Sequence, residues 1–183
     1  MMNSKLYELV KKRFTCRKYS EESISAETIK EIATKALIAP SADNRQAFRF
    51  FIIEKKEYYK VRKLIKQDWA LKAPILVFLF SVPEEAYIRN YDNKTYDAID
   101  AAIAFDHFIL LLTEAGYGTA WTTTSLDPRA LVVSLKLPKT WEFIAYTPVG
   151  YPLEHAPPME QRLRRRAEEL IISEPPNISQ YLK

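Results

Sequence analysis

One stretch of the chain, residues 97–115, limits its possible folds more than any other. Its sequence is DAIDAAIAFDHFILLLTEA, and Gly116 follows at the position where glycine commonly ends a helix. The predicted helix is apolar nearly all round, which is typical of a helix deep inside a large core or a core shared by two subunits. Asp100, Asp106 and His107 interrupt the apolar run, so it does not predict a membrane span.

The elements predicted around this helix are of both types. Ser25 is a typical N-cap, and a helix is expected to follow it and to end before Pro40. The almost wholly apolar run at 74–81 predicts a strand buried on both faces. We further expect helices at 58–65 and from Asp127-Pro128 to near Pro138, and strands at 48–54, 118–122 and 141–149. The pattern predicts one α+β domain over residues 1–183, with helices packed around a central sheet.

Composition excludes several classes of site. With a single cysteine, Cys16, and two histidines among 183 residues, the chain has no disulfide scaffold and little material for a zinc site. Three glycines against 11 prolines exclude the dinucleotide fingerprint and the phosphate loop. The N-terminal stretch lacks the apolar core of a secretory signal, so a cytoplasmic protein with no membrane association is expected. A net charge of +4 is too small by itself to imply nucleic acid.

Two of the polar segments are basic. Arg13 and Arg17 flank Thr15, an arrangement that suits an anion or a polar ring edge, although a solvated basic helix end explains it equally well. Cys16 lies between these charges, which suggests a lowered thiol pKa without the neighbours of a catalytic set. In the tail, Arg162 and Arg164–Arg166 precede Glu168 and Glu169 in a helix expected to start near Arg164. Positive charge opposes the dipole at a helix start, which favours an external anion: a phosphate, with nucleic acid as the alternative.

The other two polar segments are loops. In residues 39–46 a proline ends a helix and small polar residues follow, with Asn44 and Gln46 offering donors and acceptors for the edge of a heterocycle. Ordinary loop chemistry is the alternative. Residues 122–125 place four hydroxyl side chains at the end of a predicted strand, where strand preference alone is the simpler explanation.

Taken in order, these segments resemble the FMN-dependent nitroreductase family over about residues 6–172. RFTCR at 13–17 resembles the family's Arg-Arg-Ser-x-Arg element, and APSADNRQAF at 39–48 resembles its A-P-S-x-x-N-x-Q-P-W/F loop without the second proline. DAAIA at 100–104, with the later GYGTAW, is similar to the family's D-A-G-x-A helix and G-L-G-T-x-W ending. VGYP at 149–152 resembles I-G-Y-P, and RLR at 162–164 resembles K-x-R.

The resemblance implies a homodimer with two FMN molecules at its interface. It implies a central, mostly antiparallel mixed sheet flanked by helices, the long helix at an intertwined interface, and a tail, about 156–183, exchanged between subunits. Arg162 and Arg164 would bind the phosphate, and Arg13, Thr15 and Arg17 the phosphate and the pyrimidine side. Pro40, Ser41 and Asn44 would reach the ring from the other subunit, and Lys66 or Gln67 would reach its edge. The full set of implied cofactor-binding residues is Arg13, Phe14, Thr15, Arg17, Pro40, Ser41, Asn44, Gln46, Gln67, Thr122, Thr123, Arg162 and Arg164.

The chain departs from the family where a glycine pair or Glu-Gly commonly follows the tryptophan, because Thr122-Thr123-Thr124 stands there. The implied activity is reduction of nitroaromatics, quinones or similar small acceptors by NADH or NADPH in two half-reactions at the flavin. No side chain is expected to act as acid or base. Arg17 is the cation expected to stabilise the reduced flavin. The alternatives are reductive dehalogenation, flavin breakdown, or a nucleic-acid-binding protein that uses Arg162–Arg166.

Overall fold

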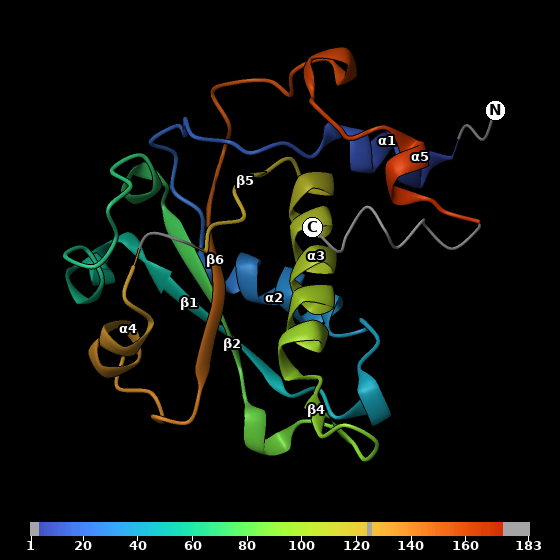
Figure 1. The fold of residues 1–183 in the computed structure, drawn as a ribbon. Coiled ribbons are helices and arrows are strands. Elements are labelled where there is room, and N and C mark those ends of the chain that lie inside the picture. Colours follow the sequence, from blue (N-terminus) through green and yellow to red (C-terminus); the bar gives the residue numbers. More distant parts are fainter. Residues whose placement is uncertain (1–3, 124–125, 174–183) are drawn as a thin grey trace, which may run out of the picture.

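The computed structural model describes residues 4–123 and 126–173, and a four-stranded antiparallel sheet lies at its centre (Figure 1). Its order is β1 (Phe48–Glu54), β2 (Ile75–Ser81), β6 (Glu142–Gly150) and β5 (Gly118–Thr119). Each residue of β2 is buried, which confirms the strand predicted from the apolar run. Phe51 pairs with Phe78 between β1 and β2, and the β2–β6 register shifts between Leu79 and Phe80.

Helices cover both faces of this sheet. One face packs against α2 (Ala26–Ala36) and α3 (Asp97–Glu114), with Ile29, Phe105 and Phe108 in the core between them. The other face packs against α4 (Pro128–Ser134) and the 3-10 helices η2 (Lys55–Lys60) and η3 (Ala70–Lys72). The remaining elements are peripheral: α1 (Lys5–Lys12), η1 (Ala42–Asn44), η4 (Pro83–Glu85), β3 (Ile88–Arg89), β4 (Lys94–Thr95), η5 (Met159–Gln161) and α5 (Ala167–Leu170).

The helix ends follow local chemistry that the sequence indicated. The hydroxyl oxygen of Ser25 accepts the Thr28 amide, as expected of an N-cap. One carboxylate oxygen of Asp127 accepts the amides of Arg129 and Ala130 at the start of α4. Gly116 follows α3 with φ +86°, a left-handed conformation that glycine adopts without strain. The expected ends of α3 are therefore confirmed.

Three helix predictions were wrong. Residues 58–65 form no α-helix: η2 ends at Lys60 and turns follow, because the buried hydroxyl of Tyr58 donates to the Ala73 carbonyl oxygen at 2.8 Å and draws the segment against η3. α4 ends at Ser134 rather than near Pro138, since Lys136 adopts φ +56° and turns the chain back. No helix starts near Arg164, because the backbone is still extended at Arg166 and α5 spans only Ala167–Leu170.

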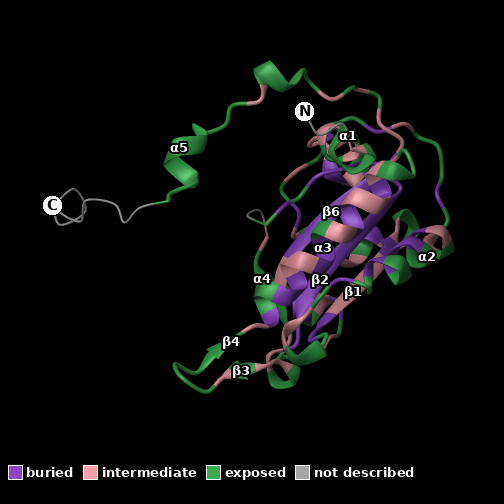
Figure 2. Cartoon of the chain, turned by 90° about the vertical axis from the view of Figure 1, so that its right-hand side faces the viewer, coloured by how far each residue is buried: buried purple, intermediate pink, exposed green. Residues whose placement is uncertain are grey.

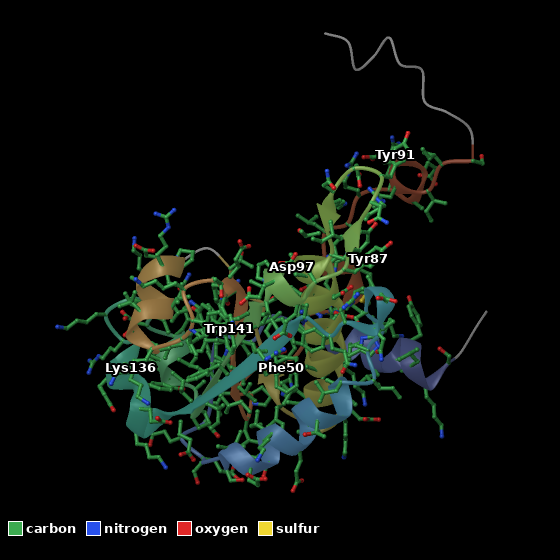
Figure 3. The ribbon with its side chains drawn as sticks, turned by 90° about the horizontal axis from the view of Figure 1, so that it is seen from below. Phe50, Tyr87, Tyr91, Asp97, Lys136 and Trp141 are labelled. Atoms are coloured by element: carbon green, nitrogen blue, oxygen red, sulfur yellow. The ribbon has the colours of Figure 1, made fainter. Side chains whose placement is uncertain are left out.

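Two parts of the chain extend away from the core. The β3–β4 hairpin projects beyond one end of α3, with Tyr91 near its outer end and Asp97 at the start of the helix (Figure 3). At the other end of α3, the segment after β6 leads away from the body and continues through α5 (Figure 2). No helix in the two described ranges has both the length and the apolar character needed to cross a membrane.

Candidate functional site

The basic segment at 13–17 lies against the edge strand β5. Thr15 forms a parallel bridge with Thr119, and the Cys16 amide donates to the Thr119 carbonyl oxygen at 2.8 Å. This approach requires glycine at 118, because a Cβ atom there would lie 2.7 Å from Cys16 Sγ. Phe14 is half-buried and packs against the small cluster that contains Cys16. The chain is thus fixed in position on both sides of Thr15.

Three arginines from the two ends of the sequence meet beside this segment. Arg162 Nη1 donates to the Arg13 carbonyl oxygen at 3.2 Å, across 149 residues of sequence. Burial lowers the pKa of the Arg13 guanidinium, and the nearby charges of Arg162 and Arg164 lower it further. Within residues 4–123 and 126–173, none of the three forms an ion pair with a carboxylate. The chain therefore holds three positive charges near one another, and the Asp106 carboxylate opposes their effect on the pKa of Arg13.

The other two tail arginines differ from these. Arg165 Nε lies 2.9 Å from one carboxylate oxygen of Glu169, and Arg166 Nε lies 3.1 Å from the other. Glu169 therefore shares its single negative charge between the two arginines and offsets them in part. Arg164 Nη1 donates to the Leu163 carbonyl oxygen at 2.8 Å, and no carboxylate of the described residues pairs with its guanidinium. The tail is thus divided into a pair that shares one carboxylate and, within the described residues, a pair that forms no ion pair.

Arg17 lies further along the same segment. Its guanidinium carbon is 5.7 Å from the centre of the Trp69 ring, and its amide donates to Glu154 Oε1 at 2.5 Å. The side chain is exposed, so the indole face is its main support on the protein.

Cys16, between these two arginines, is fully buried. Burial raises the pKa of its thiol, and the thiol donates to the Lys18 carbonyl oxygen. The expectation of a lowered pKa was therefore wrong: burial raises the thiol pKa, and the nearby Glu154 carboxylate raises it further.

The predicted loop at 39–46 lies at the opposite end of α3. Asp43, Asn44 and Gln46 all have positive φ, at 53°, 54° and 50°. The Ser41 hydroxyl accepts the Gln46 amide at 3.1 Å, and the Gln46 side-chain amide donates to Asn44 Oδ1 at 3.2 Å. Pro40 precedes this turn and is exposed. Positive φ at three non-glycine residues costs free energy, and such strain persists where the surrounding structure holds a loop in one conformation.

Gln67 and Thr122 both contact Tyr146, a fully buried residue of β6. The Tyr146 hydroxyl donates to Gln67 Oε1 at 3.1 Å, while Thr122 and Tyr146 exchange backbone hydrogen bonds of 3.0 and 2.9 Å. Thr123 follows with an exposed side chain. Thr124 and Ser125, which complete the predicted hydroxyl cluster, lie outside the described residues. Tyr146 therefore links Gln67 to Thr122, which lies 55 residues later in the sequence.

One protomer brings only part of the predicted site together. Segment 13–17 adjoins β5, just beyond the C-terminal end of α3, whereas the loop at 39–46 is bound to its first turn (Figure 1). The 18 residues of α3 extend about 27 Å, at a rise of about 1.5 Å per residue. The two groups of predicted ligands are therefore separated by about the length of the helix.

The sequence did not indicate Trp69, Glu154 or Tyr146 as neighbours of the site. Each contacts a predicted site residue from a distant part of the chain, and no local pattern of sequence marks such a contact. Asp100 lies in the DAAIA motif, from which no role was predicted for it. In the structure its carboxylate accepts a hydrogen bond from the Ala42 amide.

A family model described as "Nitroreductase family" matches residues 10–70 and 59–151 of this sequence. The chain belongs to the nitroreductase family. The resemblance inferred from the five motifs is thereby confirmed, together with the α+β fold.

Two solved structures share the fold of this nitroreductase family chain, and a curated relative is similar to it in sequence. A nitroreductase family protein from Clostridium difficile 630 has a TM-score of 0.83 at 28% identity, covering 95% of this chain and 99% of its own. A putative nitroreductase from Desulfovibrio desulfuricans, solved in complex with FMN, has a TM-score of 0.80 at 22% identity, with coverage of 95% and 99%. Iodotyrosine deiodinase 1 of Sus scrofa is 28% identical over 186 residues, which cover 84% of this chain but 63% of that protein.

Proposed function

We propose that this nitroreductase family chain is an FMN-dependent oxidoreductase that uses NADH or NADPH to reduce a small acceptor, such as a nitroaromatic or a quinone. The observation that carries the proposal is the cluster of Arg13, Arg162 and Arg164. The charges of Arg162 and Arg164 disfavour the charged form of Arg13, so a bound dianionic phosphate would relieve this repulsion as well as accept charge-assisted hydrogen bonds. The donor set fits the phosphate of FMN.

The remaining ligands would extend from this cluster along β5. Thr15 and Arg17 would hold the pyrimidine side of the flavin, with Phe14 packed behind them. Gln67 and Thr122, which both contact Tyr146, would line the ring edge together with the neighbouring Thr123. Bound FMN would supply the hydride-transfer chemistry, and these residues would bind and orient it. No titratable side chain is needed as acid or base.

We also propose that the working unit is a homodimer. The outward stripe of α3 consists of half-buried or exposed residues, mostly apolar: Ile99, Ala102, Ile103, Asp106, His107 and Leu110 (Figure 2). In the tail, Leu163 is 93% exposed and Ile171 is 77% exposed. A two-fold axis that pairs two α3 helices antiparallel would bring Pro40, Ser41, Asn44 and Gln46 of one copy to the arginine cluster of the other. It would also give the apolar tail a surface to cover.

Oligomeric state tests the dimer directly. Sedimentation of the full chain should give twice the mass of one protomer, and Leu163→Asp should weaken the association. Val133→Asp is the matched control, because Val133 is also exposed, at 67%, but lies on α4 on the opposite face of the sheet. A monomeric wild-type chain with FMN bound would contradict the two-subunit site.

Flavin uptake tests the proposed function itself. The purified chain, incubated with FMN and desalted, should retain about one flavin per protomer and be yellow. Under anaerobic conditions NADH or NADPH should bleach it, and a nitroaromatic or quinone should restore the colour. A colourless chain that cannot be loaded with FMN would overturn the proposal.

Reductive dehalogenation is the second candidate, favoured by the similarity to iodotyrosine deiodinase 1. In that reaction two electrons and a proton would replace an aryl carbon–halogen bond by carbon–hydrogen and release halide. Dithionite-reduced, FMN-loaded protein mixed with an iodophenol distinguishes the candidates. Stoichiometric iodide release favours dehalogenation, whereas rapid reduction of a nitroaromatic without iodide release favours the first proposal.

A further inference from the structure

We propose that Trp69 is a positioning residue that fixes the Arg17 guanidinium, and through it sets the reduction potential of bound FMN. This inference rests on the proposed function, in which Arg17 faces the flavin pyrimidine. It adds a residue that no motif of the sequence indicated.

The backbone around Arg17 is fixed from several sides. The amides of Cys16 and Arg17 donate to the Thr119 carbonyl oxygen and to Glu154 Oε1, at 2.8 and 2.5 Å. The buried Tyr19 hydroxyl donates to the Cys16 carbonyl oxygen at 2.7 Å. The backbone therefore leaves little freedom, and the place of the charge depends on the side-chain torsions of Arg17.

Trp69 supplies the surface that restricts those torsions. Its ring centre is 5.7 Å from the Arg17 guanidinium carbon, within the range of a cation–π contact. Trp69 is itself half-buried between two core clusters, next to Ala70, which is fully buried. The indole is thus anchored in the core and offers a face to a side chain that is otherwise exposed.

The charge of Arg17 is not neutralised by this arrangement. Across the described part of the chain, no carboxylate lies within ion-pair distance of its guanidinium; Glu154 receives only its amide. An indole face orients a cation without cancelling its charge, unlike a carboxylate. Arg17 is thereby kept both oriented and fully positive, which favours the reduced, more negative form of FMN over the oxidised form.

The test is the midpoint potential of FMN bound to four variants. Trp69→Leu should lower the preference for reduced over oxidised FMN about threefold, or about 14 mV for two electrons. Trp69→Phe keeps an aromatic face and should recover most of that loss. Arg17→Ala should have the larger effect. The double variant Arg17→Ala/Trp69→Leu should be no different from Arg17→Ala, because Trp69 acts through the guanidinium.

The chain offers a matched control outside the site. Arg49 lies 5.8 Å from the ring centre of Trp141, a contact of the same kind near the other end of the sheet. Trp141→Leu should leave the potential of FMN unchanged. A change of equal size in Trp141→Leu would show that loss of any tryptophan perturbs the protein in general, and would overturn the inference.

The outcomes separate this inference from the proposed function. A wild-type chain that takes up no FMN ends both. A wild-type chain that binds FMN with a potential insensitive to Trp69→Phe and Trp69→Leu overturns the inference alone. Additive shifts in the double variant also overturn it, since Trp69 would then act independently of Arg17. If Trp69→Leu does not fold by circular dichroism, Trp69→Met, which also removes the aromatic face, takes its place alone and in the double variant with Arg17→Ala.

Discussion

The amide of Ala42 donates hydrogen bonds to both carboxylate oxygens of Asp100, each at 3.1 Å, across 58 residues of sequence. Asp100 lies in the first turn of α3 and is 2% exposed. This contact binds the loop at 39–46 to the central helix. The position of Ser41 and Asn44, the residues proposed to reach the partner's flavin, therefore depends on a buried carboxylate.

Two substitutions of Asp100 distinguish the effect of its hydrogen-bond acceptor on stability from the effect of its charge. Asp100→Ala leaves the Ala42 amide without its acceptor, which should lower the free energy of unfolding by about 1–3 kcal/mol. Asp100→Asn keeps one acceptor oxygen and should lose less. Urea unfolding followed by circular dichroism measures both. Equal losses in the two variants would show that the carboxylate charge, not the accepted hydrogen bond, holds the loop.

Asp100 also predicts a pH dependence. Burial raises the pKa of its carboxyl group, and the charge of Asp97 adds to the effect. The native chain then takes up a proton at a pH where the unfolded chain, with a pKa of about 3.9, is still ionised. Between the two pKa values the contribution of Asp100 to the free energy of unfolding therefore rises as pH falls. The advantage of wild type over Asp100→Asn should grow over that interval in urea titrations. An advantage that shrinks with falling pH would contradict this sign.

The arginines of the tail give a paired prediction for FMN binding. Arg164→Ala should weaken FMN about 10-fold or more, because a charge-assisted hydrogen bond to phosphate is lost. The melting temperature of the FMN-free chain should stay unchanged or rise, since the repulsion of Arg13 is relieved. Arg165→Ala is the control, because Arg165 is ion-paired with Glu169, unlike Arg164. Fluorescence titration of FMN measures both variants; equal losses of affinity would contradict the division of the tail.

Much of the fold could be predicted because its signals are local. The caps at Ser25 and Asp127, the glycine after α3 and the apolar run of β2 each depend on neighbouring residues, and each was confirmed. The wrong prediction at 58–65 came from a contact with a residue outside that segment. Tyr58 bonds to the Ala73 carbonyl oxygen and shortens the expected helix, which periodicity alone does not reveal.

The same distinction applies to the candidate site. The sequence placed Arg13, Arg162 and Arg164 in one group through a family resemblance, and the structure brings them together. It did not indicate Trp69 or Glu154, because their contacts with Arg17 cross from other segments of the chain. It also gave Cys16 the wrong pKa shift, because neighbouring charges are visible in a sequence whereas burial is not.

Two of the three glycines give contrasting predictions. Gly118→Ala would place a Cβ atom 2.7 Å from Cys16 Sγ and 2.9 Å from Cys16 Cβ, so segment 13–17 must move. We expect a loss of about 1–3 kcal/mol in the free energy of unfolding, together with weaker FMN binding. Gly116→Ala is the control: its Cβ meets no atom within 4 Å, but φ is +86°. It should lose stability through backbone strain while FMN affinity stays the same. Unchanged FMN affinity in Gly118→Ala would show that β5 does not support the FMN site.

Cys16 should react slowly in the native chain. Thiol reagents attack the thiolate, and burial both raises the pKa of this thiol and shields its sulfur. A disulfide reagent should therefore label Cys16 of the FMN-free protein only as fast as segment 13–17 opens. In denaturant the labelling should be rapid. Bound FMN should slow it further, because the proposed ligands Thr15 and Arg17 flank Cys16. Rapid native labelling that FMN leaves unaffected would place Cys16 at an open surface and would argue against a flavin held by its neighbours.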